Sequence, residues 1–315
     1  MSQPTIDVIV PVYNGEKYIA EALGSITAQT CPPRTIIVVD DGSTDATVDI
    51  IMQARSGSGI EIKYLKTPNS GLSSARNHGL KASTAEYVAF LDADDVWLPD
   101  KLSEQIRIFK NSPFRQLGVV YCDYALIDEN GNEAAGVPIH PDNEIRGEVF
   151  MKLLGGNFIS GSCSAALVRR ECFSEAGYFD EALSAVEDWD MWLRIAKMFQ
   201  FDYADKALVK IRLHACSMQK NRLRMFSNEA VFFDKWAGYF DRPASARWAK
   251  SLMVRIVEDL PGLEYYRIAK SKLSPGSKKK LFLPCFGSMS LYLFVATGYI
   301  WTKRAFRRMF GGASL

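Results

Sequence analysis

The sequence predicts an α/β fold in which a mostly parallel central sheet is flanked by helices and followed by a helical C-terminal extension. In the first half of the chain, short apolar runs alternate with longer stretches of helical character, and polar clusters directly follow three of the runs. Strands that alternate with helices form parallel sheets with right-handed crossovers. The 315 residues, of which 48% are apolar and 23% charged, suit a globular chain with a large core.

Four runs rich in Val and Ile are mostly continuous in apolar character, as strands buried on both faces are. The expected strands are Ile6–Val10, Thr35–Val39, Ile60–Leu65 and Tyr87–Leu91. The expected helices that alternate with them are Glu16–Gln29, Thr44–Ala54 and Ser70–Ala82. Further along the chain, helices are expected at Ala185–Phe199, Ser227–Gly238 and Ala244–Glu258.

Polar clusters lie where three of the expected strands end. Pro11-Val12-Tyr13-Asn14-Gly15 follows the first strand, Asp40-Asp41-Gly42-Ser43 the second, and Asp92-Ala93-Asp94-Asp95 the fourth. Because open α/β sheets bind ligands at the carboxyl ends of their strands, we expect the three clusters to share a site. Each cluster taken singly is also compatible with turn chemistry, since Asp, Asn and Gly are ordinary turn residues.

The carboxylates of the third cluster, Asp92, Asp94 and Asp95, offer only oxygen ligands, which favours Mg²⁺ or Mn²⁺ over zinc. Mg²⁺ sites commonly combine one or two carboxylates with substrate phosphates, so a phosphate ester or a nucleotide is the expected substrate. The sequence has no Walker A motif and no G-x-G-x-x-G, which argues against the usual kinases, ATPases and dehydrogenases. Six scattered cysteines without a C-x-x-C pair predict reduced thiols and no zinc site.

Five motifs occur in order between Thr5 and Ser217. They read VIVPVYNGEKYIAEALGSI, VVDDGSTD, SGLSSARNHGL, YVAFLDADDVWLPDKL and EDWDMWLR. In these motifs the chain resembles the family 2 glycosyltransferases, which have the Rossmann-like glycosyltransferase-A fold. The resemblance implies an inverting enzyme that moves a sugar from a nucleotide-diphosphate sugar, with UDP-sugars favoured, to a hydroxyl of a glycan or lipid-linked acceptor in cell-surface polysaccharide synthesis.

The resemblance also implies roles for residues of the first three motifs in binding the nucleotide sugar. The residues that would line the base pocket are Pro11, Tyr13 and Asp41, with Asp40 beside them. Asp41 can accept a hydrogen bond from a uracil N–H, and the Tyr13 ring can stack on the base. Arg76 would lie near the ribose and the phosphates.

For the metal, the resemblance implies Asp94 as the main ligand and Asp92 as a ligand of either the ribose or the metal, with Asp95 a weaker candidate. His214 lies in RLHACS, where related enzymes often have R-x-H-x-x-S with the His near the metal or the diphosphate. Cys216 stands where such motifs usually have Gly. A single His is also compatible with a purely structural role.

Asp188 in EDWD is the candidate general base, because attack by a sugar hydroxyl requires a nearby carboxylate to take its proton. The alternative is that Glu187 and Asp188 merely favour the positive end of the helix that they begin.

Two other functional classes are compatible with parts of the pattern. The run VAFLDADDV also fits a haloacid-dehalogenase-type phosphatase, with Asp92 as nucleophile and Asp94 as acid/base. That motif normally opens its domain, whereas here three strand-helix units precede it. A non-catalytic module that binds nucleotide sugars is the second alternative.

The expected domains are a catalytic domain at 1–220, with a nucleotide-sugar-binding half (1–122) and an acceptor half (123–220), and a helical extension at 221–315. From Tyr265 onward the chain has ten Lys or Arg residues and no Asp or Glu, and 281–302 carries no charge. We expect 278–308 to contact an anionic membrane surface and the protein to be cytoplasmic, peripheral to the cell membrane, with no nucleic-acid partner. A membrane span and a buried hairpin remain alternatives.

Overall fold

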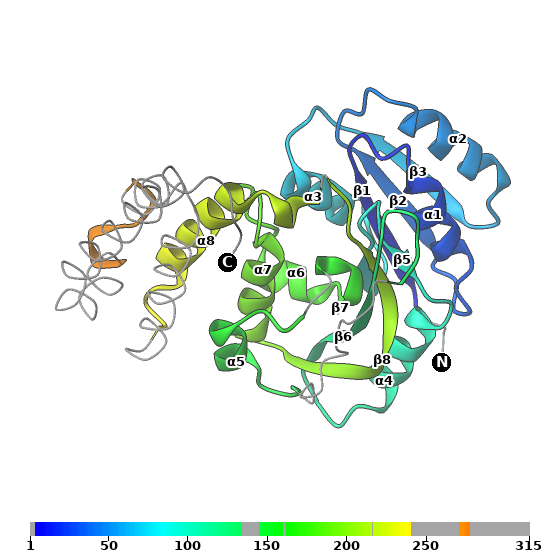
Figure 1. Ribbon diagram of the computed structural model, residues 1–315. Coiled ribbons are helices and arrows are strands. Elements are labelled where there is room, and N and C mark those ends of the chain that lie inside the picture. The colour runs from blue at the N-terminus through cyan, green and yellow to red at the C-terminus, as the bar shows by residue number, and fades with distance from the viewer. Residues whose placement is uncertain (1–3, 134–144, 160–161, 216, 241–270, 278–315) are drawn as a thin grey trace, which may run out of the picture. The chain divides into compact units, whose positions relative to one another are not determined.

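The computed structural model describes residues 4–133, 145–159, 162–215, 217–240 and 271–277 (Figure 1). The chain divides into two compact units, Met1–Lys220 and Asn221–Leu315. The predicted helix at 244–258 and the predicted membrane-associating segment at 278–308 lie outside the described residues.

The first unit is built on a curled sheet, in the order β3-β2-β1-β4-β7-β6-β8-β5. The strands are β1 (Ile6–Val12), β2 (Thr35–Asp40), β3 (Glu61–Lys66), β4 (Tyr87–Phe90), β5 (Val96–Trp97), β6 (Leu117–Ile127), β7 (Leu167–Arg169) and β8 (Gln200–Arg212). The pairs β1–β2, β1–β4, β2–β3 and β6–β8 are parallel, and β4–β7, β6–β7 and β5–β8 are antiparallel. The predicted α/β class with a mostly parallel sheet is confirmed.

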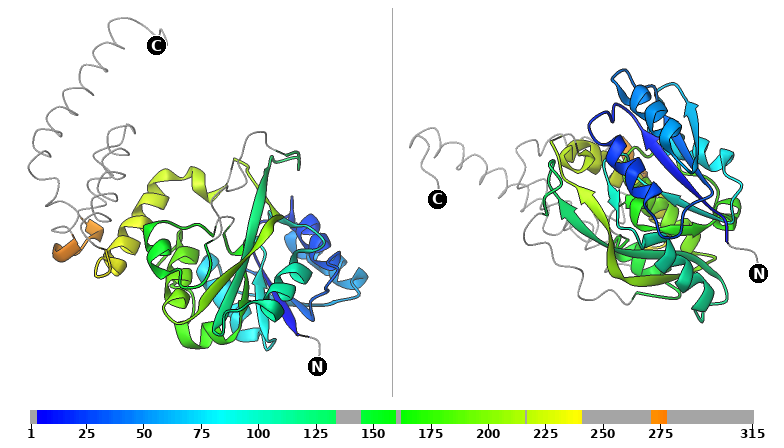
Figure 2. Two further views of the ribbon diagram at one scale, coloured as in Figure 1. Left: turned by 90° about the horizontal axis from the view of Figure 1, so that it is seen from below. Right: turned by 90° about the vertical axis from the view of Figure 1, so that its right-hand side faces the viewer.

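Helices cover both faces of this sheet. They are α1 (Ile19–Thr27), α2 (Thr47–Gly57), α3 (Leu72–Ala82), α4 (Lys101–Asn111), α5 (Phe150–Gly155), α6 (Glu171–Ala176) and α7 (Glu187–Ala196). Two short 3₁₀ turns, η1 (Ser162–Ala165) and η2 (Met218–Lys220), join the elements. Figures 1 and 2 show α1 and α2 lying together at one flank of the sheet, in the blue part of the chain.

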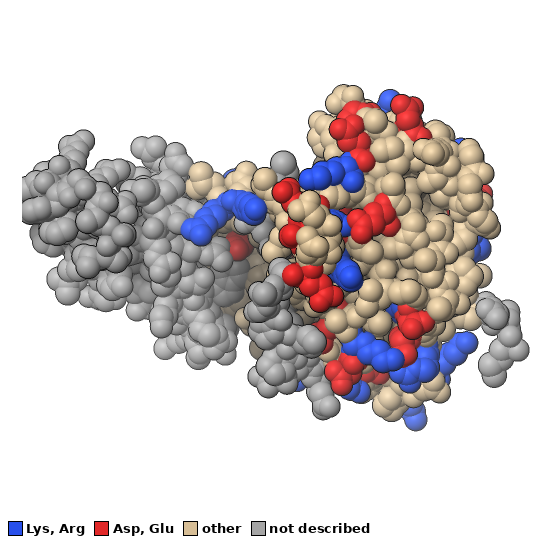
Figure 3. Space-filling view, turned by 45° about the vertical axis from the view of Figure 1, so that its right-hand side comes forward, with Lys and Arg blue, Asp and Glu red and all other residues tan. Residues whose placement is uncertain are grey.

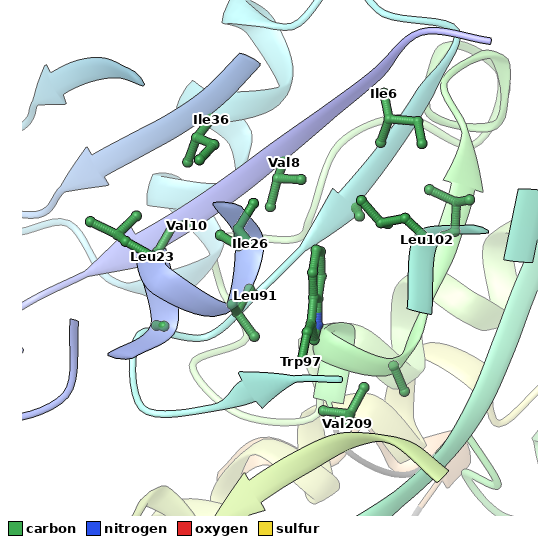
Figure 4. Close-up of a cluster of buried hydrophobic side chains, with 14 of the residues drawn as sticks. Ile6, Val8, Val10, Leu23, Ile26, Ile36, Leu91, Trp97, Leu102 and Val209 are labelled. Carbon is green, nitrogen blue, oxygen red and sulfur yellow. The ribbon is translucent and has the colours of Figure 1, made fainter. Parts of the chain in front are cut away.

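The core on the α1 side consists of side chains that alternate along β1 and point toward the helix. Ile6, Val8 and Val10 of β1 belong to one buried cluster with Leu23 and Ile26 of α1, and all are almost fully buried (Figure 4). Burial of each such side chain is worth about 1.5–3 kcal/mol relative to exposure. This packing fixes β1, and so it fixes the loop that follows the strand.

On the opposite face of β1, Ile9 packs against α3 at a glycine. A Cβ atom added to Gly79 would lie 2.4 Å from Ile9 Cγ2, so only glycine allows this close approach of helix and strand. The close packing fixes α3, which carries Arg76, directly against the sheet.

The first four predicted strands and three predicted helices are present, with shifted ends. Helix α1 begins three residues after Glu16, because the chain first makes a turn in which the N–H groups of Tyr18 and Ile19 both donate to the carbonyl of Gly15 at 3.0 Å. Helix α2 begins at Thr47, whose N–H donates to the Asp45 carboxylate at 3.1 Å.

In the second unit, α8 (Arg222–Trp236) is capped by Asn221, whose side chain accepts from the N–H of Arg224 at 3.1 Å. This is an ordinary N-cap arrangement, which satisfies one of the free donors of the first helical turn. Across the described residues, no helix combines the length and the apolar character that a membrane crossing would need.

Charged side chains of both signs lie together on the face of the molecule shown in Figure 3.

The four cysteines that the structure describes are free thiols, and three of them, Cys122, Cys163 and Cys172, are buried.

Candidate active site

The three polar clusters lie along one edge of the sheet, because β2, β1 and β4 are parallel neighbours. Hydrogen bonds join the first two clusters. The N–H of Asn14 donates to Ser43 Oγ at 2.9 Å, and the N–H of Thr44 donates to Asn14 Oδ1 at 2.8 Å. The first and third clusters are also adjacent, since a Cβ on Gly15 would lie 3.7 Å from that of Ala93. The predicted convergence of the clusters is therefore present.

Within the first cluster, Tyr13 is 53% exposed, whereas Pro11 is buried as part of β1. Asn14 has a left-handed backbone with φ of 49°, a conformation that Asn tolerates better than most residues. The turn at Asn14 leaves the Tyr13 ring facing solvent, where a planar base could stack on it.

Asp40 and Asp41 are buried and accept hydrogen bonds from the surrounding loops. Asp40 accepts from the N–H of Ser43 at 2.8 Å and from the Tyr64 hydroxyl at 2.7 Å. Burial alone would raise the pKa of Asp40, but these two hydrogen bonds outweigh it and hold the pKa below its usual value. Asp41 accepts from the N–H groups of Ser70 and Gly71 at 2.9 and 2.7 Å. Hydrogen bonds within and between loops therefore explain much of the burial of Asp40 and Asp41. Base binding by Asp41 stays a prediction.

Arg76 is fully buried and lies between two carboxylates from distant parts of the chain. Its Nη2 donates to Asp92 Oδ1 at 2.7 Å and its Nη1 to Glu187 Oε1 at 2.6 Å. Such charge-assisted bonds are the strong class of hydrogen bond in proteins. The buried Arg76 thus fixes the orientation of the Asp92 carboxylate. A direct contact of Arg76 with ribose or phosphate stays a prediction.

Asp94 lies beside His214, with Asp94 Oδ2 and His214 Nε2 at 2.9 Å. The antiparallel register of β5 with β8 pairs Val96 with Lys210, which brings the end of β8 and the following RLH segment to the carboxylate cluster. The Asp94 side chain is 36% exposed and that of His214 16%. Burial and the nearby Asp92 raise the pKa of Asp94, and His214 partly offsets the rise.

Asp95 is turned into the protein. It is 3% exposed, and it accepts from Ser164 Oγ at 2.7 Å and from the N–H of Arg212 at 3.2 Å. Burial and the neighbouring Asp94 raise its pKa well above the usual value. Asp95 therefore holds the loop together and does not face a ligand.

Asp188 occupies the first turn of α7, after Val186, which has a left-handed backbone with φ of 56°. A β-branched residue in this region is an outlier, and such strained positions cluster at functional sites. Asp188 Oδ1 accepts from the N–H of Trp189 at 2.7 Å, and Oδ2 lies 3.4 Å from Asn157 Nδ2.

Burial, and then the adjacent charge of Glu187, raise the pKa of Asp188 to about 7. A simple helix-end charge would be expected to have a lowered pKa, because the helix dipole favours the ionised form. A carboxyl group that titrates near neutrality is suited to exchange protons with a substrate.

The residues present fit a divalent ion only in part. Asp94 and His214 are oxygen and imidazole ligands that Mn²⁺ or Mg²⁺ accept, and Asp92 lies two residues away. In the described part of the chain, no three His, Cys, Asp or Glu side chains gather closely enough to hold an ion by themselves. A site of this kind therefore suits an ion whose remaining ligands are substrate phosphates and water.

Four residues of this region were not singled out from the sequence as site residues: Glu187, Arg212, Ser164 and Asn157. Glu187 and Arg212 lie within the motifs EDWD and RLHACS, and their position in these motifs could have marked them as site residues. Ser164 and Asn157 lie in a segment without a recognisable motif, and their contacts with the carboxylates of Asp95 and Asp188 follow only from the fold.

The comparisons with known proteins decide the family. Residues 7–177 match the family described as "Glycosyl transferase family 2". An uncharacterized glycosyltransferase of Rickettsia prowazekii is 33% identical over 242 residues, covering 76% of this chain and 72% of the relative. The chain belongs to glycosyl transferase family 2. A second relative is TuaG of Bacillus subtilis, a glycosyltransferase named for teichuronic acid biosynthesis. TuaG is 31% identical to this chain, and the match covers 70% of this chain and 83% of TuaG.

Solved structures support the fold of this family 2 chain. Staphylococcus aureus TarS 1–349 in complex with UDP-GlcNAc has a TM-score of 0.57 and 23% identity, covering 91% of this chain and 75% of that one. The mannosyltransferase PcManGT of Pyrobaculum calidifontis, in complex with GDP-Man and Mn²⁺, has a TM-score of 0.57 and 20% identity over 96% and 89%. The predicted glycosyltransferase-A fold is confirmed.

Some relatives are longer than this family 2 chain, which spans 35% of a glycosyltransferase of Rickettsia felis and 44% of a longer TarS chain. Membership of the family removes the support for the haloacid-dehalogenase-type phosphatase, in which Asp92 would have been the nucleophile.

Proposed function

We propose that this glycosyltransferase is an inverting enzyme that transfers a sugar from a UDP-sugar to a hydroxyl of a glycan or lipid-linked acceptor in cell-surface polysaccharide synthesis. The choice of a uridine nucleotide draws support from TarS, which has been solved with UDP-GlcNAc. The choice of polysaccharide synthesis draws support from TuaG, which is named for teichuronic acid biosynthesis.

The observation that carries this proposal is the link between the two halves of the site through Arg76. One side of the buried guanidinium holds Asp92, next to the pair of Asp94 and His214. The other side holds Glu187, the residue before Asp188. Arg76 therefore binds both the edge of the sheet that would hold the donor and the first turn of α7. That turn carries the candidate base, Asp188, whose pKa is raised to about 7.

In this mechanism, Asp188 accepts the proton of the acceptor hydroxyl as its oxygen attacks the anomeric carbon of the donor. The attack comes from the face opposite the nucleotide diphosphate, which leaves, and so the configuration at that carbon inverts. Base catalysis of this kind contributes about 10²–10⁴-fold to a rate. Tyr13, with Pro11, Asp40 and Asp41 behind it, binds the base of the nucleotide.

Asp94 and His214, with Asp92 assisting, would hold a Mg²⁺ or Mn²⁺ ion together with the donor diphosphate. A bound ion of this type neutralises the charge that develops on the leaving diphosphate, without any proton transfer. The requirement for a metal draws support from PcManGT, a protein of this fold that has been solved in complex with GDP-Man and Mn²⁺.

We also propose that residues 1–220 form the catalytic domain, that the protein is cytoplasmic, and that the basic segment at 278–308 holds it against the anionic inner face of the cell membrane. Lys278, Lys279 and Lys280 precede the uncharged run, and the basic residues that follow it are Lys303, Arg304, Arg307 and Arg308. Basic clusters on both flanks suit attachment with both ends on the same anionic side. A lipid-linked acceptor would explain the benefit of such attachment.

The experiment that tests the function is a screen of UDP-, GDP-, TDP- and CMP-sugars, with release of the free nucleotide as the measurement. We expect turnover with a UDP-sugar in the presence of Mn²⁺. Binding of UDP-sugars without turnover, in the wild type and with every acceptor offered, would favour a non-catalytic nucleotide-sugar-binding module instead. Neither turnover nor binding with any donor would contradict the proposal.

A further inference from the structure

Arg212 is an almost fully buried residue at the end of β8, and it has no role in the mechanism above. It is 3% exposed and occupies the motif position two residues before His214. The antiparallel pairing of Val96 with Lys210, continued by two residues, places Arg212 opposite Asp94. The strand register therefore brings this guanidinium to the carboxylate cluster.

The side chain and the main chain of Arg212 both form hydrogen bonds with the loop 92–95, which carries the carboxylate cluster. Arg212 Nε donates to the carbonyl of Asp94 at 2.9 Å, and the Arg212 N–H donates to Asp95 Oδ1 at 3.2 Å. Nη1 donates to the carbonyl of Asp128 at 3.3 Å. These contacts tie the loop that carries Asp94 to the ends of β6 and β8.

The remaining contacts of Arg212 reach α1. Its Nη2 lies 2.5 Å from Glu21 Oε2, and its guanidinium lies over the Tyr18 ring at 4.6 Å from the centroid. The Tyr18 ring also contacts the His214 ring, with 5.3 Å between centroids. Arg212 is thus bonded to the backbone of Asp94 and packed on the ring that supports His214.

We propose that Arg212 is a positioning residue for the metal-binding pair of Asp94 and His214, an inference that rests on the proposed function. The guanidinium binds the carbonyl behind one member of the pair and stacks on the ring beside the other. Its planar fork can reach Asp94, Asp128 and Glu21 together, whereas a lysine ammonium cannot reproduce this geometry. Residues that orient metal ligands in this way typically change metal affinity by about 10–100-fold when they are replaced.

The test is the affinity for Mn²⁺ in the presence of UDP, measured by the EPR signal of free Mn²⁺, in the full-length protein and in Arg212→Lys. We expect the affinity to fall by about tenfold or more in the variant. We also expect donor turnover by Arg212→Lys to recover at high Mn²⁺ concentration, because the affinity for the ion changes and not the base.

Arg34→Lys is the matched control, because Arg34 also forms a multidentate ion pair within the first unit. It donates to both oxygens of the buried Asp7, at 3.1 and 2.7 Å, at the opposite end of β2 from Asp40. Thermal unfolding should report a loss of stability in both variants. Only Arg212→Lys should lose Mn²⁺ affinity.

Tyr18→Leu provides a second route, since it removes the ring between Arg212 and His214 and leaves the guanidinium in place. It should also weaken Mn²⁺ binding, and it allows the inference to be tested if Arg212→Lys does not fold.

An Arg212→Lys protein that folds and binds Mn²⁺ within twofold of the wild type would overturn the inference, as would an equal loss of affinity in Arg34→Lys. A wild type that turns over donor without binding Mn²⁺ would keep the proposed transfer and reject the role of Arg212.

Discussion

Burial separates the acidic residues of the site into those that support loops and those that can react. Asp40, Asp41 and Asp95 are at most 4% exposed and accept hydrogen bonds from neighbouring loops, whereas Asp94 and Asp188 are only half-buried. The sequence predicted the carboxylates but not this division. Asp94 and Asp95 are adjacent in the chain, and Asp95 is turned inward by Ser164 and the N–H of Arg212, which the fold brings to it.

The residue whose titration is most informative is Asp188. A general base must be ionised to accept a proton, and the pKa of Asp188 is raised to about 7 by burial and by Glu187. We expect kcat/KM for transfer to fall about tenfold for each pH unit below 7 and to level off above it. Asp188→Asn should lower transfer by about 10²–10⁴-fold at pH 8, lack this inflexion, and bind donor nearly as well as the wild type.

Stability provides a control for the alternative in which Asp188 only favours the end of α7. Because the folded-state pKa is raised, the stability that protonated Asp188 contributes is present at low pH and is lost as the pH rises through about 7. Asp188→Asn should therefore be at least as stable as the wild type at pH 8. A helix-end charge predicts the reverse, a loss of about 1 kcal/mol or less. Wild-type transfer rates in Asp188→Asn would remove Asp188 from the mechanism.

At the scale of elements, the strands β1 to β4 were predictable from the sequence, and the second half of the sheet, β5 to β8, was not. Strands β1, β2 and β4 are buried at every position, and apart from Asp7, Thr35 and Asp40 all of their residues are apolar. Strands β6 and β8 contain buried charged residues, Asp123 and Asp202, which interrupt the apolar pattern that predicts a strand. Their pairing depends on long-range partners such as the hydroxyl of Tyr203, which bonds to Asp123.

The hydrogen bonds between the loops after β1 and β2 should prepare the nucleotide pocket before the donor binds. Asn14 both donates to Ser43 and accepts from Thr44, and it lies next to the exposed Tyr13. Asn14→Ala keeps the main-chain N–H that binds Ser43 but loses the Oδ1 atom that accepts from Thr44. We expect it to weaken UDP binding by about 3–10-fold, because one lost hydrogen bond is worth about 0.5–1.5 kcal/mol. Isothermal titration calorimetry with UDP measures this change.

Ser56→Ala is the control for Asn14→Ala, because Ser56 makes a comparable exposed hydrogen bond, 3.0 Å to the carbonyl of Met52, within α2. It should leave UDP affinity unchanged. Unaltered UDP affinity in a folded Asn14→Ala protein would show that these loop contacts do not shape the pocket.

At the scale of the whole molecule, the site depends on contacts between distant parts of the first unit. Arg76 and Glu187 are 111 positions apart and form one ion pair. The sequence could assign Arg76 and Asp188 to separate motifs, but it carried no information that Glu187 joins them. The periodicity of a sequence reports burial along an element, whereas partners across the fold follow only from how the elements pack.

The basic segment at 278–308 provides a test of membrane attachment for the full-length protein. We expect it to sediment with vesicles that contain an anionic lipid at low salt and not with neutral vesicles, since each basic residue near such a surface contributes about 1 kcal/mol. Replacing the basic residues on both flanks with Gln should release it; they are Lys278, Lys279, Lys280, Lys303, Arg304, Arg307 and Arg308. Full-length protein that ignores anionic vesicles at low salt would rule out this attachment.

The central claim is that Asp94 and His214 support donor cleavage through a divalent ion while Asp188 provides the base. The most direct measurement is the rate of UDP release from the donor found in the screen, for the wild type and for Asp94→Asn, in EDTA and after Mn²⁺ is restored. We predict that EDTA abolishes turnover by the wild type, that Mn²⁺ restores it, and that Asp94→Asn folds but remains almost inactive in both conditions. Full activity in EDTA, or wild-type turnover by Asp94→Asn, would contradict the account.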